Sequence, residues 1–534
     1  MLNTAQATRG MVVAPHHLAA EAGLAVLREG GNAIEAMVAA AAAIAVVYPH
    51  MNALGGDNFW LISERGEPPA GIDACGAAAG LATREYYAAH AHGASIPVRG
   101  PLAALTVAGA VSGWQAALDI SARWGGRMPL DRLFADAAHL ARHGAPVSKS
   151  QSINTAAKRA ELEGVLGFAE TFLPGGHAPQ PGSLVTMKRL ADTLDHLARA
   201  GLDDFYRGDL ARQMATELES VGSPLRFADF ERHRAQSVTP LRVDLRHGHV
   251  YGMPPPTQGL ASLIILGLFD RLDCAVADSF EYVHGLVEAT KRAFLVRDTH
   301  VTDPAYMTED AQGFLSPGVL DATARKINPH RAMPWPNTAK PGDTVWLGCI
   351  DGEGRAISFI QSIYWEFGSG LVLPTSGIVW QNRGTSFSLD ASRQNALMPH
   401  RKPFHTIQPA MALLSDGRLM PYGTMGGEGQ PQTQAAIYTR HIIYGQELQQ
   451  AISAPRWLLG RTWGGAATNL RIENRFPPEV IQALRLAGHD VEVVGAFDEV
   501  MGHAGALVLH ARGEKAGCIE GASDPRSDGR AAGF

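Results

Sequence analysis

Thr344 is the residue whose neighbours along the chain point most directly to chemistry. It opens the run TVWLGCIDGEGRAISFIQSIY, which alternates apolar and small residues around Asp351-Gly352-Glu353-Gly354 and therefore predicts a β-hairpin. The Pro- and charge-rich segment 325–343 before it predicts exposed backbone. If the Asp343–Thr344 bond were cut, Thr344 would hold a hydroxyl and a free α-amine that can accept the hydroxyl proton. Without that cut, Thr344 would be an ordinary β-branched residue at the start of a strand.

Seven sequence blocks, in the same order along the chain, resemble the γ-glutamyltransferase family of N-terminal-nucleophile hydrolases. The blocks are GMVVAPHHLAAEAGLAVLREGGNAIEAMVAAA from Gly10, ALGGDNFWLI from Ala53, ATREYY from Ala82, MPPPTQG from Met253, DTVW from Asp343, TMGGEGQPQTQ from Thr424 and GASDPRS from Gly521. The resemblance implies self-cleavage between Asp343 and Thr344, with Thr344 as the new N-terminal nucleophile. It also implies an αββα sandwich of four layers, in which a large subunit (1–343) and a small subunit (344–534) form one intertwined unit.

The resemblance also implies roles for four further residues. Ser362 lies where relatives keep a threonine that steers the catalytic hydroxyl. Gly426 and Gly427 match a glycine pair whose backbone N–H groups face the tetrahedral oxygen, and no Gly-Lys-Ser/Thr follows them to suggest a phosphate loop. Arg84 matches an arginine that binds the substrate α-carboxylate, a task that suits its planar fork of donors.

The run VWQNRGTSFSLD departs from the pattern of the γ-glutamyl enzymes. An acidic residue of those enzymes holds the substrate α-amino group, whereas the matching position near Ser386 has no charge. Arg383 stands where relatives have a neutral glutamine. Losing a carboxylate and gaining a cation is unfavourable for a substrate that carries an ammonium group and favourable for one that is only anionic.

Other departures predict a shorter cleft. His405 and Thr406 replace paired serines in RKPFHTIQP, and Tyr364, followed by Trp365, replaces an asparagine on the hairpin. A short anionic amide without an α-amine fits these changes, and oxamate is the smallest of that kind. The blocks SFIQSIYWEFGSG and PRWLLGRTW resemble the oxamate-hydrolysing branch of the family. We therefore expect oxamate hydrolysis to oxalate and ammonia, with the carboxylate held by Arg84, helped by Arg383 or His405.

Three other functions remain open at this point. The chain would act as a γ-glutamyl hydrolase or transferase on glutathione-like substrates if its amino-group site were unusual. It would be an unprocessed binding protein if no cleavage took place. A metal hydrolase is the weakest alternative, because His16-His17 and His247/His249 offer nitrogens without an H-E-x-x-H motif or an acidic cluster. We expect no metal and no cofactor.

Composition restricts the partners and the location of the chain. A net charge of −6 with scattered basic residues gives no basis for binding nucleic acid or an anionic membrane. The four cysteines form no C-x-x-C pair. The N-terminus lacks the apolar core of a signal peptide, and the run AMVAAAAAIAVV (36–47) is too short to span a bilayer, so it predicts a buried helix. We expect a cytoplasmic heterodimer of the two subunits, or a pair of such heterodimers.

Apolar periodicity and breakers predict the elements that would position these residues. The expected helices cover 17–28, 34–47, 130–142, 190–200, 209–219, a segment from Gly259, and 280–297. The expected strands, besides the hairpin from Thr344, cover 58–62, 241–251, 377–381, 410–414 and 506–510. The fold is expected to begin at Met11. Helices and strands that mix along both halves favour a layered α/β fold.

Overall fold

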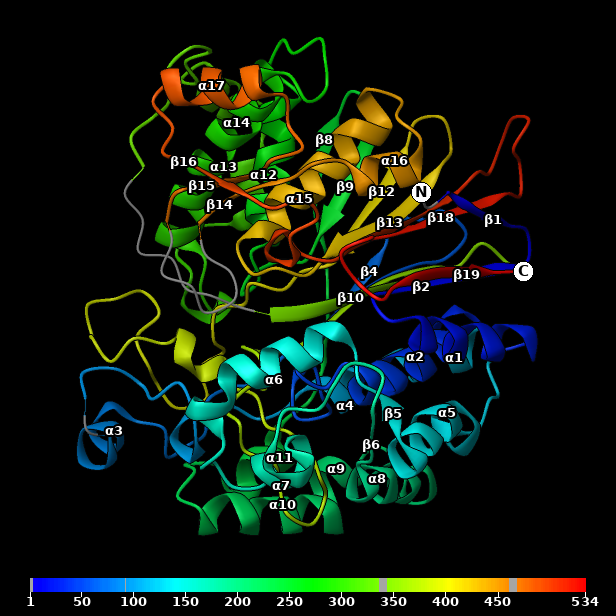
Figure 1. Ribbon diagram of the computed structural model, residues 1–534, viewed down its shortest axis with the longest axis vertical. Helices are drawn as coiled ribbons and strands as arrows, with labels where there is room; N and C mark the ends of the chain where they lie inside the picture. Colours follow the sequence, from blue (N-terminus) through cyan, green and yellow to red (C-terminus); the bar gives the residue numbers. More distant parts are fainter. Residues whose placement is uncertain (1–2, 92, 336–342, 461–467) are drawn as a thin grey trace.

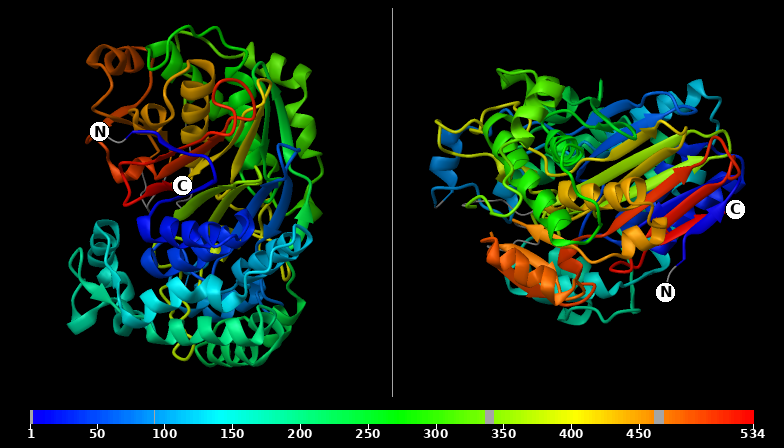
Figure 2. Two further views of the ribbon diagram at one scale, coloured as in Figure 1. Left: turned by 90° about the vertical axis from the view of Figure 1, so that its right-hand side faces the viewer. Right: turned by 90° about the horizontal axis from the view of Figure 1, so that it is seen from above.

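The computed structural model describes residues 3–91, 93–335, 343–460 and 468–534. In this part of the chain, strands form two large packed sheets, and helices cover both outer faces (Figures 1 and 2). The predicted four-layer αββα sandwich is therefore confirmed.

The two sheets each contain seven strands within the described residues. Sheet A has the order β1 (Ala5–Ala7), β18 (Ile519–Ser523), β17 (Ala504–Leu509), β13 (Leu419–Thr424), β12 (Ala410–Leu414), β9 (Gly248–Gly252) and β8 (Leu241–Leu245). Sheet B has the order β19 (Arg530–Gly533), β2 (Gly10–Ala14), β10 (Asp343–Asp351), β11 (Ala356–Tyr364), β3 (Asp57–Ser63), β4 (Ala70–Ala74) and β7 (Gln236–Val238). Both sheets combine strands from before and after residue 344, so cleavage there would leave two subunits that share both sheets.

Helices form the two outer layers (Figure 1). Against sheet B lie α1 (His17–Arg28), α2 (Ala33–Val47) and α4 (Ala110–Arg123); α5 (Leu130–His143) packs on α2, and α8 (Lys188–Ala200) packs on α5. Against sheet A lie α12 (Gly259–Phe269), α15 (Gly429–Tyr438) and α16 (Leu448–Ser453); α13 (Phe280–His300) and α14 (Pro317–Ala324) pack on α12, and α17 (Pro478–Leu486) packs on α13. The remaining α-helices of the described residues are α3 (Arg84–His90), α6 (Lys149–Leu162), α7 (Phe168–Phe172), α9 (Asp204–Arg207), α10 (Asp209–Ser220) and α11 (Phe227–Arg232). Smaller sheets join β5 (Ala145–Pro146) to β6 (Leu184–Val185), and β14 (Trp457–Leu459) to β15 (Leu470–Glu473) and β16 (Val491–Val494).

Helix α2 shows how the sequence builds the layer beneath sheet B. Asn32 caps its N-terminus and forms a reciprocal capping box with Glu35, which satisfies backbone donors that the helix itself leaves unpaired. All residues of α2 are buried, as predicted for this alanine-rich run, because small side chains let neighbouring helices approach closely. In the described part of the chain, no helix is both long and apolar enough to cross a bilayer.

The predicted hairpin of β10 and β11 is confirmed at the centre of sheet B. Its register pairs Val345 with Gln361 and Ile350 with Ala356, with an irregularity between residues 343 and 345. Apolar side chains of the hairpin and its neighbours, including Trp346, Ile360 and Phe59, fill the space between the two sheets. Side chains alternate along a strand, so residues two positions apart lie on the same face. Thr344, two residues before Trp346, and Ser362, two residues after Ile360, therefore point into the same space.

Three predictions about strands and the chain start are corrected. The expected strand 377–381 forms only isolated bridges, because its backbone bonds go to neighbouring loops; Trp380 pairs with Gly55 and Val379 with Val372. The expected strand 241–251 is a hairpin, β8 and β9, because the turn between them reverses the chain. The fold begins before Met11, since β1 pairs with β18 at the edge of sheet A.

Candidate active site

Thr344 lies buried near the start of β10, in the space between the sheets. Its Oγ1 accepts a hydrogen bond of 3.4 Å from Nε2 of Gln430, in the first turn of α15. Asp343 precedes it in the same strand, so the structure is that of the uncleaved chain. Of the segment 325–343 that was expected to be exposed, residues 325–335 are mostly exposed, whereas residues 336–342 and the side chain of Asp343 lie outside the described residues.

Ser362 lies on β11 beside the start of β10 and contacts Arg383. Its Oγ accepts hydrogen bonds from the backbone N–H of Tyr364 at 2.8 Å and from Nη2 of Arg383 at 3.3 Å. Nη1 of Arg383 donates to Oγ1 of Thr406, also at 3.3 Å. The guanidinium carbon lies 4.0 Å from the centroid of the Tyr364 ring, a cation–π contact. Four residues that the sequence predicted separately thus form one buried group.

The charge of Arg383 has no close counter-ion in the described part of the chain. Its side chain is fully buried, and within the described residues no carboxylate lies within ion-pair distance and its Nε has no hydrogen-bond partner. Burial lowers the pKa of Arg383 to about 10, so the guanidinium stays charged at neutral pH. A buried cation with unused donors is a favourable place for a small anion.

Tyr364 has a backbone conformation that its residue type rarely adopts. Its φ is +82° at the end of β11, and its side chain is buried. Such strain concentrates at functional sites, where the surroundings hold it in place. Here it directs the ring against Arg383, and burial raises the pKa of the Tyr364 hydroxyl, so the ring stays neutral.

The glycine pair lies in the turn between β13 and α15. Gly426 has φ +119° and Gly427 φ +52°, values that favour glycine over every other residue. Gln258 ties this turn to the substrate region, because its Nε2 donates to the carbonyls of Gly427 and Thr406. Arg297 holds the Gln258 amide in turn, with Nη1 3.1 Å from Oε1. The turn precedes a helix N-terminus, whose dipole favours negative charge.

Asp57 and His405 add a buried acid–imidazole contact next to Ser362. Asp57 pairs with Ser362 across β3 and β11, and its Oδ1 accepts the backbone N–H groups of Gly76 and Gly109, each at 3.0 Å. Its Oδ2 lies 3.6 Å from Nε2 of His405. Burial raises the pKa of Asp57 to about 7 and lowers that of His405 well below its usual value. The imidazole is therefore neutral, and the contact is not an ion pair at neutral pH.

The sequence reasoning did not identify Asp57, Gln258 or Gln430 as site residues. Each lies inside a block that carries the family resemblance, ALGGDNFWLI, MPPPTQG or TMGGEGQPQTQ. The usable signal was an acidic or amide side chain beside an apolar run, since such a side chain needs a partner when its strand or helix is buried.

Arg84 is not brought together with this group. It is exposed at the start of α3, which lies at the margin of the molecule (Figure 1). Among the described residues, no hydrogen bond or ion pair joins it to Thr344, Arg383 or His405. The role expected for Arg84 stays a prediction.

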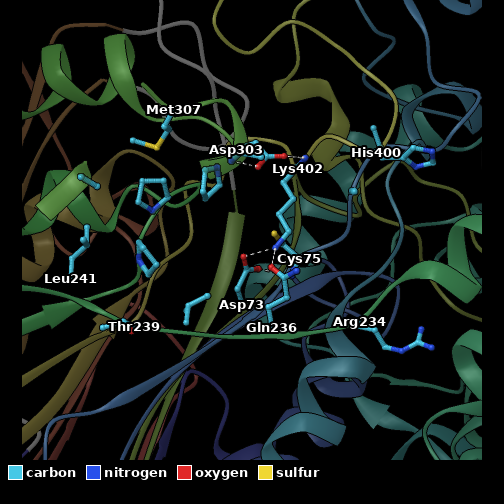
Figure 3. Close-up of a pocket in the computed structure, with 18 of the residues that line it drawn as sticks. Asp73, Cys75, Arg234, Gln236, Thr239, Leu241, Asp303, Met307, His400 and Lys402 are labelled. Carbon is cyan, nitrogen blue, oxygen red and sulfur yellow. Dashed lines mark hydrogen bonds and ion pairs between the residues drawn. The ribbon is translucent and has the colours of Figure 1, made fainter. Parts of the chain in front are cut away.

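A cavity of about 1150 Å³ lies near this group without including any of the predicted site residues among its described lining. Cys75, directly after β4, and Asp73 form one wall, and Lys402 lies between Asp73 and Asp303 (Figure 3). Nζ of Lys402 is 2.7 Å from the Asp73 carboxylate and 3.0 Å from the Gln236 amide oxygen. Elsewhere too, the described residues contain no group of three or more His, Cys, Asp or Glu side chains placed to hold a metal ion.

The chain is similar in sequence and in fold to known proteins. The family model described as "Gamma-glutamyltranspeptidase" matches residues 19–534. The chain is 56% identical to the oxamate amidohydrolase proenzyme of Klebsiella pneumoniae and 41% identical to the glutathione hydrolase-like YwrD proenzyme of Bacillus subtilis, over 99% of both chains in each case. The crystal structure of cephalosporin acylase from Bacillus halodurans superimposes with a TM-score of 0.91 at 33% identity, covering 100% of this chain and 97% of the other. The chain is thus an enzyme that belongs to the γ-glutamyltranspeptidase family.

Proposed function

We propose that this amidohydrolase cuts its own chain before Thr344 and then hydrolyses oxamate to oxalate and ammonia. The observation that carries the proposal is the buried Arg383, whose guanidinium contacts only hydroxyl groups and an aromatic ring within the described residues. The identity of 56% to an oxamate amidohydrolase proenzyme supports the same substrate and the same precursor form.

The environment of Arg383 fits oxamate better than a γ-glutamyl group. Arg383 is a charged donor for the oxamate carboxylate, and Thr406 and His405 lie beside it. Ser386, at the position expected to hold a substrate ammonium group, is a buried, uncharged residue. We therefore assign the substrate carboxylate to Arg383 rather than to the exposed Arg84.

The proposed reaction has two halves. Oγ1 of Thr344 attacks the amide carbon of oxamate, and the α-amine freed by self-cleavage takes the hydroxyl proton. The backbone N–H groups of Gly426 and Gly427 stabilise the negative oxygen of the tetrahedral intermediate. That intermediate expels ammonia with the proton from the amine, leaving an oxalyl ester on Thr344. Water then adds to the ester carbon and releases oxalate.

A γ-glutamyl substrate is the second candidate, because a glutathione hydrolase-like proenzyme is 41% identical over the whole chain. Its ammonium group would have to approach the buried, charged guanidinium of Arg383, which forms no ion pair within the described residues. Repulsion between like charges in a buried site disfavours that arrangement.

Separate assays of the two substrates test the proposal. We expect ammonia from oxamate in a glutamate-dehydrogenase-coupled assay, and at least about 100-fold lower kcat/KM for γ-glutamyl-p-nitroanilide, since lost charge recognition is worth about 2–3 kcal/mol. The control is oxamide, a neutral amide of nearly the same shape. Faster turnover of the γ-glutamyl anilide than of oxamate would overturn the assignment of the substrate.

A further inference from the structure

A row of four polar side chains crosses sheet B next to the proposed nucleophile. Thr344 on β10, Ser362 on β11, Asp57 on β3 and Cys75 just after β4 follow one another on adjacent strands, and all four are buried. Ser362 and Asp57 are direct partners in the register, so their side chains lie on the same face, close together. Asp57 is the only carboxylate of this row.

The carboxylate of Asp57 is only half satisfied. Its Oδ1 accepts two backbone N–H groups, whereas Oδ2 has no hydrogen-bond partner within the described residues. Nε2 of the His405 imidazole lies 3.6 Å from Oδ2, and both nitrogens of the imidazole also lack partners there; the Gln381 side chain faces Asp57 as well. Both side chains are fully buried, and buried polar atoms left unpaired are costly. One added proton between Oδ2 and Nε2 would satisfy both.

Among the charged and titratable groups around Asp57, Asp57 is the one whose raised pKa lies near neutral pH. Arg383 is the nearby cation, and Cys75 and Tyr206 face Asp57 from other elements. Burial raises the pKa of the Cys75 thiol and of the Tyr206 hydroxyl, and both stay neutral. The charge of Lys402 contributes to lowering the pKa of His405 and opposes the rise in the pKa of Cys75, and Lys402 forms an ion pair with Asp73.

We propose that Asp57 is a specificity-determining residue, which takes up one proton as a small anion binds beside Arg383 and then donates it as a hydrogen bond to Nε2 of His405. The proposal rests on the proposed function, because it takes Arg383 as the ligand of the substrate carboxylate. An ionised Asp57 would repel a second anion next to Arg383, whereas a protonated Asp57 would not. Cys75, one strand away from Asp57, lines the cavity, and solvent there is the source we propose for the proton.

The pH dependence follows from the sign of this linkage. Burial raises the pKa of Asp57 to about 7, and a bound anion raises it further. Below the pKa that Asp57 has without a bound anion, Asp57 is already protonated, so affinity for the anion does not change with pH through this group. Above it, each unit of pH weakens anion binding by up to about tenfold, until the higher pKa of the complex is reached.

Calorimetry with oxalate, an unreactive dianion, measures this proton directly. Titrations of the mature enzyme at pH 8 in buffers of different ionisation enthalpy give the number of protons bound per oxalate. We expect about one more proton in the wild type than in Asp57→Asn, and a fall in affinity between pH 7 and 8 that is larger in the wild type by up to about tenfold. The α-amine of Thr344 also titrates in this range, but it is present in both proteins.

Matched variants and ligands separate the possible outcomes. Asp351→Asn removes another buried carboxylate at the far end of β10, and we expect it to keep the wild-type proton uptake. Oxamide, which is neutral, should bind without uptake at Asp57. Equal uptake in the wild type and Asp57→Asn, or no uptake in the wild type, overturns the inference even if a variant folds poorly. Proton-linked oxalate binding by a protein that does not hydrolyse oxamate would uphold it and reject the proposed function alone.

Discussion

Two clusters of buried arginine and aspartate, one around Asp524 and one around Asp57, differ in how their charges are paired. At the first, Arg526 forms ion pairs with Glu473 at 2.7 Å and with Asp524 at 3.1 Å, and Arg456 lies 2.6 Å from the other oxygen of Asp524. All four side chains are buried, and backbone N–H groups of Ala504 and Arg526 complete the shell of Asp524. We call these four residues the paired cluster.

The second place, which we call the open cluster, consists of Arg383, Asp57 and His405. Its three side chains are equally buried, yet Arg383 makes two hydroxyl contacts of 3.3 Å and no ion pair within the described residues. The two aspartates consequently differ in the direction of their pKa shifts. Burial alone would raise the pKa of Asp524, but Arg456 and Arg526 hold it below its usual value, whereas that of Asp57 rises to about 7.

The difference teaches that burial alone does not separate structural charges from functional ones. A cluster in which every charge has its counter-ion stabilises the fold and has nothing left for a ligand. The open cluster, in which the described residues give Arg383 no ion pair and Oδ2 of Asp57 no hydrogen bond, has contacts left for a ligand. The same substitution in both clusters should therefore have opposite effects.

The largest effect is expected from Asp524→Asn. Removing one partner of a buried network leaves Arg456 and Arg526 partly uncompensated, so the free energy of unfolding should fall by about 3–5 kcal/mol at pH 7. The measurement is urea denaturation in the Thr344→Ala background, which keeps every sample as one intact chain. The loss should shrink in acid, as the wild-type carboxyl is protonated on passing through its lowered pKa. A change below about 1 kcal/mol would remove the distinction between the clusters.

Arg383→Gln should instead affect catalysis. We expect kcat/KM for oxamate to fall by about 100-fold, because a charge-assisted contact to the substrate carboxylate is lost, with most of the change in KM. The free energy of unfolding should change by less than about 1 kcal/mol, since no counter-ion is left unpaired. Arg383→Lys keeps the charge without the planar fork and should recover part of the activity. Unchanged kinetics of the glutamine variant would show that another residue binds the carboxylate.

Asp57→Asn should give the smallest effect, with the opposite sign to Asp524→Asn. The folded pKa of Asp57 lies above its unfolded value of 3.8, so the wild type loses stability as the pH rises from about 4 to about 7. The asparagine removes this loss and should stabilise the intact chain by about 1–3 kcal/mol at pH 8, with little change at pH 4. The same denaturation experiment at the two pH values measures it. Destabilisation of equal size at both would mean that Asp57 is a structural acid.

Much of the scaffold could be predicted from the sequence because it depends on local pattern. The helices α1 and α2 and the hairpin of β10 and β11 have strong periodicity and clear breakers. The family blocks placed Thr344 and Ser362 on that hairpin. The missing acidic residue near Ser386 and the added cation of Arg383 could be read as one change of substrate charge, and the structure places Arg383 in direct contact with Thr406.

The unpredicted features depend on contacts between distant segments. Asp57 precedes the expected strand start, and only the register with Ser362 shows that it lies beside Arg383 and His405. Gln258 looked like part of a proline-rich turn, yet it joins the glycine turn to the loop of Thr406. The segment 377–381 was apolar enough for a strand, but its backbone partners are loops that no pattern indicates.

Mass spectrometry of purified protein, combined with ammonia release from oxamate, tests the proposed role of Thr344 most directly. For the wild type we expect two fragments of roughly 36 and 20 kDa, in proportion to chain length, the smaller beginning at Thr344, together with ammonia release. Thr344→Ala should stay one chain and release ammonia at least about 1000-fold more slowly. Full activity from a chain whose Asp343–Thr344 bond is intact would contradict the threonine mechanism.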